Sequence, residues 1–492
     1  MPELPYSLST PQCILHWVRH TPDAVAVIEA DRPYTYGDLG VGIAQYVKAL
    51  RATGLQSGML MGVACANRYL CLLVLFASEI IGATTLSLTR HDVDSDDPVL
   101  ARCDLLCIGM EGAVPSDRGG VLHLTQAVID RIGRTPVGAG DLGLLDHCPD
   151  TDTIVTLVRT SGSTGRPKVL AMTHGRTMAL LERTAWQPSD PGYEWNFLNL
   201  YGFSNRSSFQ ESSIALRVGC TVVSSGLGSM FTDMERFGQF RATLVSGDAV
   251  RLAHAVPAGW SGPRTGLIHI KGGALPEAIR DRLRREIVTH VYHNYGANET
   301  SRLTIIGDDG VGILLPDVSI RIMTDERTEA LQGETGLIEA RARGMVDGYR
   351  WDEGATHAAF RDGWYCTGDM GFMPGPDRLV VLGRADDWIN LGGIKFSPQA
   401  IEQRMKEIPG VEDAVLLALP DAAGHDRLHV VLQSHDAELV DRYRERLIAS
   451  LSGQVTVFVP HVMTRLPRTE TGKVRRPALR RLLAEATSGV AV

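Results

Sequence analysis

Thr160-Ser-Gly-Ser-Thr-Gly-Arg-Pro-Lys168 is a small-residue loop that directly follows the β-branched run Thr153-Ile-Val-Thr-Leu-Val-Arg159. Such a run, bounded by Gly and Ser, predicts a strand that ends in a loop. Gly162 and Gly165 permit backbone angles that direct successive N–H groups at one point, which makes an anion cradle. The loop is not a Walker A loop, because Pro167 precedes its lysine where that motif has glycine.

Strand and helix patterns alternate outward from this loop. A helix is expected over 175–186, and an amphipathic helix over 276–286. Short strands are expected at 242–246, 265–270 and 378–383. This alternation predicts an α/β protein with mixed layers and parallel strand pairing.

A domain boundary is expected near Gly383-Arg-Ala-Asp-Asp387. The pattern beyond it predicts helices at 399–408 and 439–451 and strands at 411–419, 428–432 and 455–459. Together these would form a small α+β unit of about a hundred residues, a normal domain size. We therefore expect a large multi-subdomain α/β body over 1–383 and a small mobile lid over 384–492.

Length and composition are those of an ordinary soluble protein with several folding units. The chain has 492 residues, 44% of them apolar and 22% charged, which excludes a disordered or collagenous chain. Its net charge of −8 argues against nucleic-acid binding. The basic run between Arg475 and Arg481 lies at helical spacing, and we expect it to form a solvated helix face.

Cysteine usage and the apolar runs indicate a cytoplasmic protein. Eight cysteines are too sparse for a disulfide framework, and no His or Cys cluster completes a zinc site around Cys103 and Cys107. The start of the chain lacks the charge order of a signal peptide. The most apolar stretch, Leu70 to Ala77, is shorter than the ~20 residues that a membrane crossing needs, so no membrane partner is expected.

Six motifs in one order give a resemblance to a known family, the adenylate-forming superfamily of acyl-CoA synthetases, nonribosomal-peptide adenylation domains and luciferases. The motifs are the loop 160–168, Gly272-Gly-Ala-Leu-Pro276, Asn294-Tyr-Gly-Ala-Asn-Glu299, Gly363-Trp-Tyr-Cys-Thr-Gly-Asp369, Gly383-Arg-Ala-Asp-Asp387 continuing to Gly393-Ile-Lys395, and Pro467-Arg-Thr-Glu-Thr-Gly-Lys473. The resemblance implies ATP and Mg²⁺ as cofactors, with CoA as a further candidate.

The resemblance also implies an ATP/AMP site, and the residue chemistry fits it. Tyr295 offers a ring for stacking on adenine, Glu299 an oxygen ligand for Mg²⁺, and Asp369 a bidentate acceptor for ribose hydroxyls. The remaining nucleotide contacts would come from Thr160, Ser161, Gly162, Ser163, Thr164, Gly165, Lys168, Gly273, Ala274, Leu275, Asn294, Gly296, Ala297, Asn298, Arg384 and Lys395.

Lys473 is the residue expected to carry catalysis, together with Thr164 and Glu299. Attack of an oxyanion on the α-phosphorus builds negative charge, which a lysine on a mobile domain can neutralise after closure. Asp386 stands where the family has its hinge. A nucleotide-binding regulator or inactive homologue would lack Lys473, Glu299 or Asp369, and the chain keeps all three.

The substrate region departs from the family patterns. Asn298 replaces the usual Thr of the Tyr-Gly-x-Thr-Glu motif, and no Asp for an α-amino group is found near Asn205. Carrying over the family's pocket positions suggests a polar, cationic lining, which would leave groups unpaired against a long fatty acid. The residues so placed are Asn205, Arg206, Ser207, Gln210, Ser246, Ile270, Lys271, Gly272, Asn294 and Arg302.

Two enzyme hypotheses follow. The first is an AMP-forming ligase for a small polar, doubly anionic or aryl acid, which passes the acyl group to CoA, a carrier-protein thiol or an amine. A carrier protein would act in trans, because the chain ends soon after Lys473. The second is a diazotase-like enzyme that activates nitrite and diazotises an aromatic amine. Either enzyme is expected to be a monomer or a homodimer.

Overall fold

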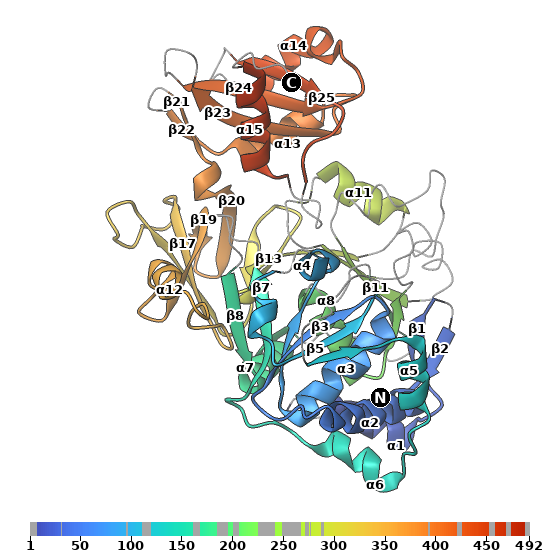
Figure 1. Cartoon of the computed structure of the whole chain (residues 1–492). Coiled ribbons are helices and arrows are strands. Elements are labelled where there is room, and N and C mark those ends of the chain that lie inside the picture. The colour runs from blue at the N-terminus through green and yellow to red at the C-terminus, as the bar shows by residue number, and fades with distance from the viewer. Residues whose placement is uncertain are drawn as a thin grey trace.

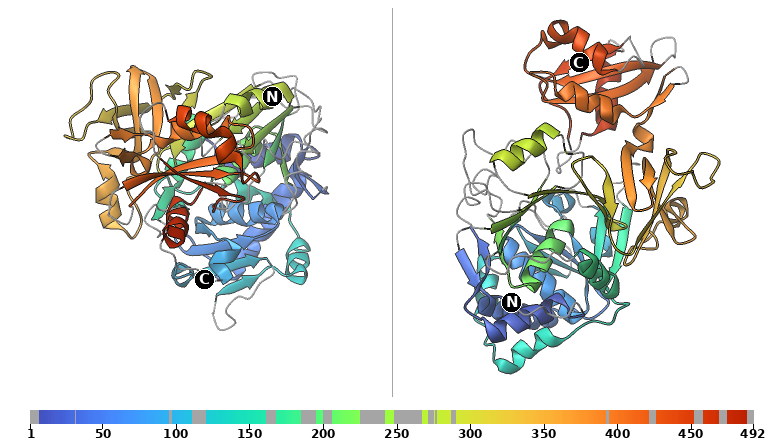
Figure 2. Two further views of the ribbon diagram at one scale, coloured as in Figure 1. Left: turned by 90° about the horizontal axis from the view of Figure 1, so that it is seen from above. Right: turned by 180° about the vertical axis from the view of Figure 1, so that it is seen from behind.

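A computed structural model of the chain describes residues 7–30, 32–94, 97–110, 120–160, 168–184, 195–199, 206–224, 242–247, 267–270, 275, 277–286, 290–391, 394–420, 426–451, 458–468 and 474–487. Figures 1 and 2 show a large lower body, an orange and yellow group of strands beside it, and a red C-terminal unit above. The mixed α/β class and the small α+β C-terminal unit agree with the sequence-based expectation.

A mostly parallel sheet carries the phosphate-loop hairpin. Within the described residues it has six strands in the order β6-β5-β3-β4-β7-β8. They span Val121–His123, Leu105–Gly109, Leu60–Cys65, Thr84–Ser87, Ile154–Thr160 and Lys168–Thr173. All pairs are parallel except β7 with β8, whose antiparallel pairing holds the two ends of the Thr160–Lys168 loop together.

A second, larger sheet changes from parallel to antiparallel along its width. Its parallel half runs β1-β10-β9-β11-β12-β13 over Val25–Glu29, Thr221–Ser224, Trp195–Asn199, Ala242–Gly247, Leu267–Ile270 and His290–Ala297, with β2 (Arg32–Thr35) antiparallel at its edge. Its antiparallel half continues through β14, β15, β20, β19, β17 and β16 over Ser301–Ile306, Gly312–Leu314, Arg378–Arg384, Trp364–Gly375, Gly336–Ala342 and Val318–Met323, and β18 (Phe360–Arg361) pairs with β19. The sequence predicted mixed α/β layers with parallel pairing, which the first half has; the antiparallel half was not predicted.

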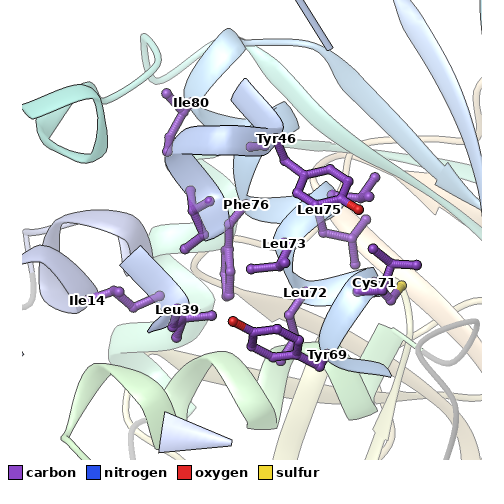
Figure 3. Packing of buried hydrophobic residues seen from close by; sticks show 14 of the residues in the cluster. Ile14, Leu39, Tyr46, Tyr69, Cys71, Leu72, Leu73, Leu75, Phe76 and Ile80 are labelled. Carbon is purple, nitrogen blue, oxygen red and sulfur yellow. The ribbon is translucent and has the colours of Figure 1, made fainter. Parts of the chain in front are cut away.

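Helices α1 (Thr10–His20), α2 (Tyr36–Ala52) and α3 (Arg68–Ile81) form the main core of the body (Figure 3). The apolar stretch Leu70 to Ala77 lies within α3 and is buried along its whole length. It is therefore a core helix, since a helix buried on every side is apolar all round. No helix in the described part of the chain has the length and apolar content needed to cross a bilayer.

Tyr36 joins α2 to the far side of this core. Its side chain is fully buried, and its hydroxyl donates to the carbonyls of Leu216 at 3.2 Å and Cys220 at 3.0 Å. Tyr36→Phe leaves these buried acceptors without that donor, so we expect the free energy of unfolding to fall by about 1–3 kcal/mol. Urea denaturation would measure the loss. Tyr292→Phe, at a side chain 38% exposed, is the matched control, and equal stability of the two variants would contradict this role of Tyr36.

The other helices cover the sheets and lead into the hairpins. They are α4 (Arg90–Asp94), α5 (Gln126–Gly133), α6 (Ala139–Leu142), α7 (His174–Thr184), α8 (Arg206–Arg217), α11 (Glu277–Glu286) and α12 (Glu353–Ala359), with short 3₁₀ turns η1 (Leu100–Arg102) and η2 (Gly143–Asp146). Helix α7 returns from the end of β8, and α8 leads into β10.

The C-terminal unit has two hydrophobic clusters of its own. Strands β23 (Asp413–Pro420), β24 (Asp426–Gln433) and β25 (Val459–Met463) pack with α13 (Pro398–Lys406), α14 (Leu439–Ser450) and α15 (Arg476–Thr487). The hairpin β21 (Ile389–Leu391) and β22 (Ile394–Phe396) precedes them, after turn η3 (Ala385–Asp387). The last expected strand, 455–459, is observed from Val459 onward, and residues 455–457 lie outside the described part.

Arg476 corrects the expectation of a solvated basic helix face. Its guanidinium donates to Oε1 of Glu402 at 2.6 Å and to the carbonyl of Leu416 at 2.8 Å, and it lies 3.5 Å from the Asp387 carboxylate. The spacing predicted the helix α15 correctly. It did not reveal that Arg476 is a partly buried cation that ties this helix to α13 and to turn η3.

Candidate functional site

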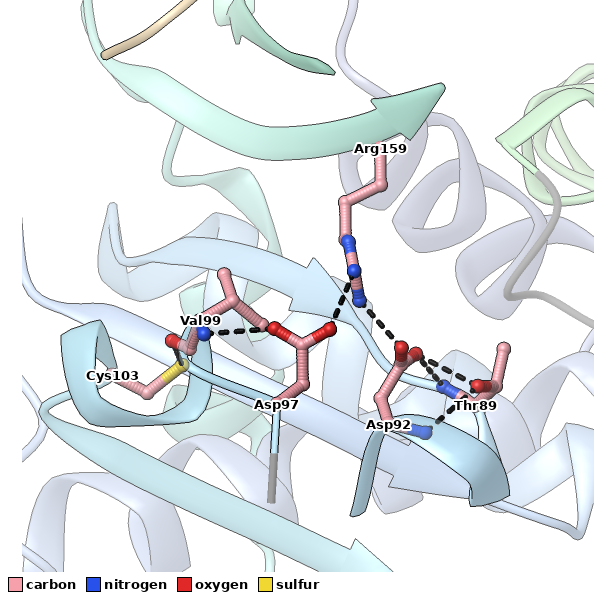
Figure 4. A network of polar contacts seen from close by, with 6 residues as sticks. All are labelled: Thr89, Asp92, Asp97, Val99, Cys103 and Arg159. Atoms are coloured by element: carbon pink, nitrogen blue, oxygen red, sulfur yellow. Dashed lines mark hydrogen bonds and ion pairs between the residues drawn. The ribbon is translucent and has the colours of Figure 1, made fainter. Parts of the chain in front are cut away.

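Strands β7 and β8 lead into and out of the loop 160–168, which the sequence predicts to be an anion cradle. Thr160 and Lys168 are paired in register, so the residues between them close a loop at the end of this hairpin. Arg159, next to Thr160, contacts Asp92 at 2.5 Å and Asp97 at 2.7 Å, and Asp92 also accepts from Thr89 (Figure 4). This ion-pair network anchors the strand that enters the loop. It could not be predicted from the sequence, because Asp92 and Asp97 are far from Arg159 in the chain.

Asp369 lies at the centre of a polar group on the large sheet. The Tyr295 hydroxyl donates to its Oδ2 at 2.7 Å, and Arg384 donates to its Oδ1 at 3.3 Å and to the Thr367 carbonyl at 2.8 Å. Burial and the charge of Asp369 raise the pKa of Tyr295 well above its ordinary value, so Tyr295 is a donor at neutral pH. Gly368 has φ +73°, which only glycine adopts readily, and this turn brings the carboxylate to Arg384.

Glu299, Tyr349 and Lys168 lie far apart in the sequence but form one group in the structure. Glu299 is 8% exposed, and the Tyr349 hydroxyl donates to its Oε1 at 2.9 Å. Lys168 lies over the Tyr349 ring, 4.6 Å from its centroid, because Arg350 pairs with Val169 on β8. The expected Mg²⁺ ligand and the expected phosphate-binding lysine are thus joined through Tyr349, a residue that the sequence analysis missed.

A separate polar cluster under α8 consists of Glu211, His269 and Arg302. Oε1 of Glu211 lies 3.7 Å from Nη2 of Arg302 and 3.7 Å from Nδ1 of His269. Burial lowers the pKa of Arg302, while Glu211 opposes that shift. The structure therefore brings one expected pocket residue, Arg302, together with Glu211 and His269, which the sequence did not single out. Asn294, on β13, has its side-chain amide buried.

Gln210 lies beside this cluster on α8, and Ile270 and Leu275 are buried. Gly296 is paired with Arg302, and Ala297 donates to the Thr300 hydroxyl at 3.3 Å. Asn298 lies at the surface just before Glu299.

The C-terminal unit begins close to Asp369. Arg384 ends β20, and Asp386 lies in the following turn η3. Further on, Arg468 contacts Asp413 at 2.5 Å and pairs with Val474. Arg475 donates to the Pro467 carbonyl at 2.8 Å, so both flanks of the segment 469–473 are held on the three-stranded sheet of this unit.

Many of the expected site residues cannot be placed. Lys473, Ser161, Gly162, Ser163, Thr164, Gly165, Asn205, Lys271, Gly272, Gly273 and Ala274 lie outside the described residues. The backbones of Arg206, Ser207, Ser246 and Lys395 are described within α8, β11 and β22, but their side chains are not.

Sequence comparisons identify what the chain is similar to. The family model described as "AMP-binding enzyme" matches residues 117–350. The 3-hydroxybenzoate–CoA ligase of Aromatoleum sp. (strain CIB) is 25% identical over 495 residues, which cover 94% of each chain. The phenyloxazoline synthase MbtB of Mycobacterium sp. (strain MCS) is 26% identical over 516 residues, which cover 96% of this chain and 41% of that protein.

A solved structure has the same fold. The o-succinylbenzoate CoA synthetase of Bacillus subtilis, solved with its acyl-adenylate intermediate, matches with a TM-score of 0.80 at 21% identity, covering 96% of this chain and 98% of that one.

Proposed function

The chain belongs to the adenylate-forming superfamily of AMP-binding enzymes, and on that premise we propose that it adenylates a small polar or aryl carboxylic acid. It is an AMP-forming ligase that uses ATP. The observation that carries the proposal is Asp369, held between Tyr295 and Arg384 with one carboxylate oxygen facing each. A carboxylate positioned in this way is suited to accept hydrogen bonds from the two hydroxyls of a ribose.

The proposed first step joins the acid to the α-phosphorus of ATP. A carboxylate oxygen of the acid attacks that phosphorus, the bond to the β-phosphate oxygen breaks, and pyrophosphate leaves. Lys473 neutralises the developing charge once residues 384–492 have turned about Asp386 to close the site. Lys168 and the loop that it ends hold the phosphates.

Glu299 is the residue that would hold Mg²⁺, which supplies charge neutralisation on the phosphates. Its buried carboxylate has Tyr349 on Oε1, and carboxylate oxygens are the ligands that this cation prefers. The donor set therefore fits the metal.

The proposed second step transfers the acyl group to a thiol. A thiolate attacks the acyl carbonyl, and AMP leaves with the bonding electron pair. CoA is the acceptor that the aryl-acid ligase relative favours, and a carrier-protein thiol is the second candidate.

Pyrophosphate release over a panel of acids tests the proposal. We expect release with aryl or short polar acids and none with fatty acids or common α-amino acids, with an acid-free reaction as the control. The panel includes nitrite with an aromatic amine. If the mixture of nitrite and aromatic amine is the one member of the panel that releases pyrophosphate, the carboxylate proposal is overturned in favour of diazotisation.

Tyr349→Phe tests the positioning of Glu299. The variant loses the 2.9 Å hydrogen bond to Glu299 but keeps a ring beneath Lys168. Because partners of metal-binding groups are typically worth 10- to 100-fold, we expect kcat/KM for MgATP to fall by about 10-fold, with the KM for the acid unchanged. Tyr443→Phe in the C-terminal unit is the control. An unchanged kcat/KM would show that Tyr349 does not position Glu299 for function.

A further inference from the structure

Arg183 is a partly buried cation that the proposed reaction does not use. It lies near the end of α7, and its Nη2 donates to the carbonyl of Thr300, the residue after Glu299. Its Nε and Nη1 are buried and have no hydrogen-bond partner among the residues that the structure describes. Leaving such donors unpaired is costly, more so for a charged group than for a neutral one.

The charged groups around Arg183 do not neutralise its positive charge. Burial, Arg343 and Arg302 hold the pKa of Arg183 at about 10, and Asp317 only partly opposes this. Asp317 lies 3.2 Å from Arg343, which also contacts Glu182 at 2.8 Å, so its charge is already shared. Among the described side chains, Glu211 is the one carboxylate within 4 Å of Arg302, and its 3.7 Å separation is too long for a hydrogen bond.

The Asn294 side-chain amide lies on the same side of the sheet as the contact between Glu211 and Arg302. His269 is in register with Tyr292, so both side chains leave the same face, and Asn294, two residues further along β13, leaves that face as well. The contact of His269 with Glu211 places this face under α8. Both polar atoms of the Asn294 side chain are buried without a hydrogen-bond partner in the described part of the chain.

We propose that Arg183 and Arg302 bind a second anionic group on the acid substrate, so that the enzyme selects a dicarboxylate over a monocarboxylate. The inference rests on the proposed carboxylate adenylation. One carboxylate of the substrate meets the α-phosphorus, and the other meets the two guanidinium groups, with the Asn294 amide as an additional donor. Planar guanidinium groups are well suited to hold a carboxylate through paired N–H donors.

Matched substrate pairs test the proposal in the unmodified enzyme. Pyrophosphate release is measured with isophthalate against its monoamide and with succinate against succinamate, because each monoamide keeps the shape but removes one charge. We expect kcat/KM for at least one diacid to exceed that of its monoamide by about 10- to 100-fold. Equal values, or a preference for both monoamides, would overturn the proposal.

Substitutions then assign the preference to the two arginines. Arg183→Gln and Arg302→Gln are each expected to lower kcat/KM for the diacid by about 10-fold or more relative to kcat/KM for the monoamide, with the KM for ATP within about threefold. Arg183→Lys keeps the charge without the paired donors and should be intermediate. Arg343→Gln is the matched control, since Arg343 is 46% exposed and is already paired with acidic side chains.

The outcomes separate this inference from the function on which it rests. If Arg183→Gln raises the KM for ATP as much as that for the diacid, the guanidinium binds the nucleotide phosphates and the inference is wrong. If no carboxylic acid releases pyrophosphate, the proposed function itself fails. Release with benzoate and butanoate at the diacid rate would keep the function and reject the dicarboxylate preference. Melting temperatures of all variants identify any loss of folding.

Discussion

Asp369→Asn is expected to lower kcat/KM for ATP by about 100-fold, because two charge-assisted hydrogen bonds to the ribose lose their ionised acceptor. The asparagine has the same shape, so Tyr295 can still donate to the oxygen that remains. Its NH₂ group, however, would face either Tyr295 or Arg384, both of which are donors in this structure. The KM for ATP in pyrophosphate release and AMP binding by calorimetry would measure the loss.

The matched control is Asp347→Asn, also in the N-terminal body. Asp347 contacts Arg176 at 2.6 Å, and its side chain is 83% exposed, so its substitution should change kcat/KM by less than about twofold. Undiminished AMP binding by Asp369→Asn would show that the ribose lies elsewhere.

Lys473→Ala is expected to slow adenylate formation by about 100- to 1,000-fold and to leave ATP binding within a few-fold. The physical reason is that the lysine acts on charge that develops in the transition state, not on the bound nucleotide. Thioester formation from a chemically prepared acyl-adenylate should continue, because pyrophosphate does not leave in that step. Separate quenched assays of the two half-reactions would measure the rate of adenylate formation and the rate of thioester formation.

Arg481→Ala removes an exposed cation from the same C-terminal unit and serves as the control. It should leave both half-reactions unchanged. Pyrophosphate release by Lys473→Ala at the wild-type rate would remove Lys473 from the catalytic machinery.

The order of local elements could be predicted well from the sequence, because strand and helix periods are local properties. The strand 153–159 is observed as Ile154–Thr160, and the amphipathic helix 276–286 as Glu277–Glu286. The antiparallel half of the large sheet was not predicted. Its pairings, such as Glu339 with Cys366, join residues whose partners periodicity cannot identify.

The motifs indicated which residues to examine at the site but not how they contact one another. Tyr295, Asp369 and Arg384 come from three motifs, and the structure joins them in one hydrogen-bonded group. Arg183 could not be singled out, because an arginine near the end of an expected helix is usually a solvated charge. Its role depends on burial against Thr300, a contact over 117 residues of sequence.

The two anchored flanks of residues 469–473 have a mechanical consequence. Arg468 is fixed to Asp413, and Arg476 is fixed to Glu402 and lies near Asp387 beside the expected hinge. The residues on both sides of 469–473 therefore belong to the folded C-terminal unit, and a rotation about the expected hinge would carry them together with that unit. The conformational entropy of confining both flanks is already spent when the unit folds. Loss of the contact between Arg468 and Asp413 would free the N-terminal flank, so that this flank would no longer have to move with the unit.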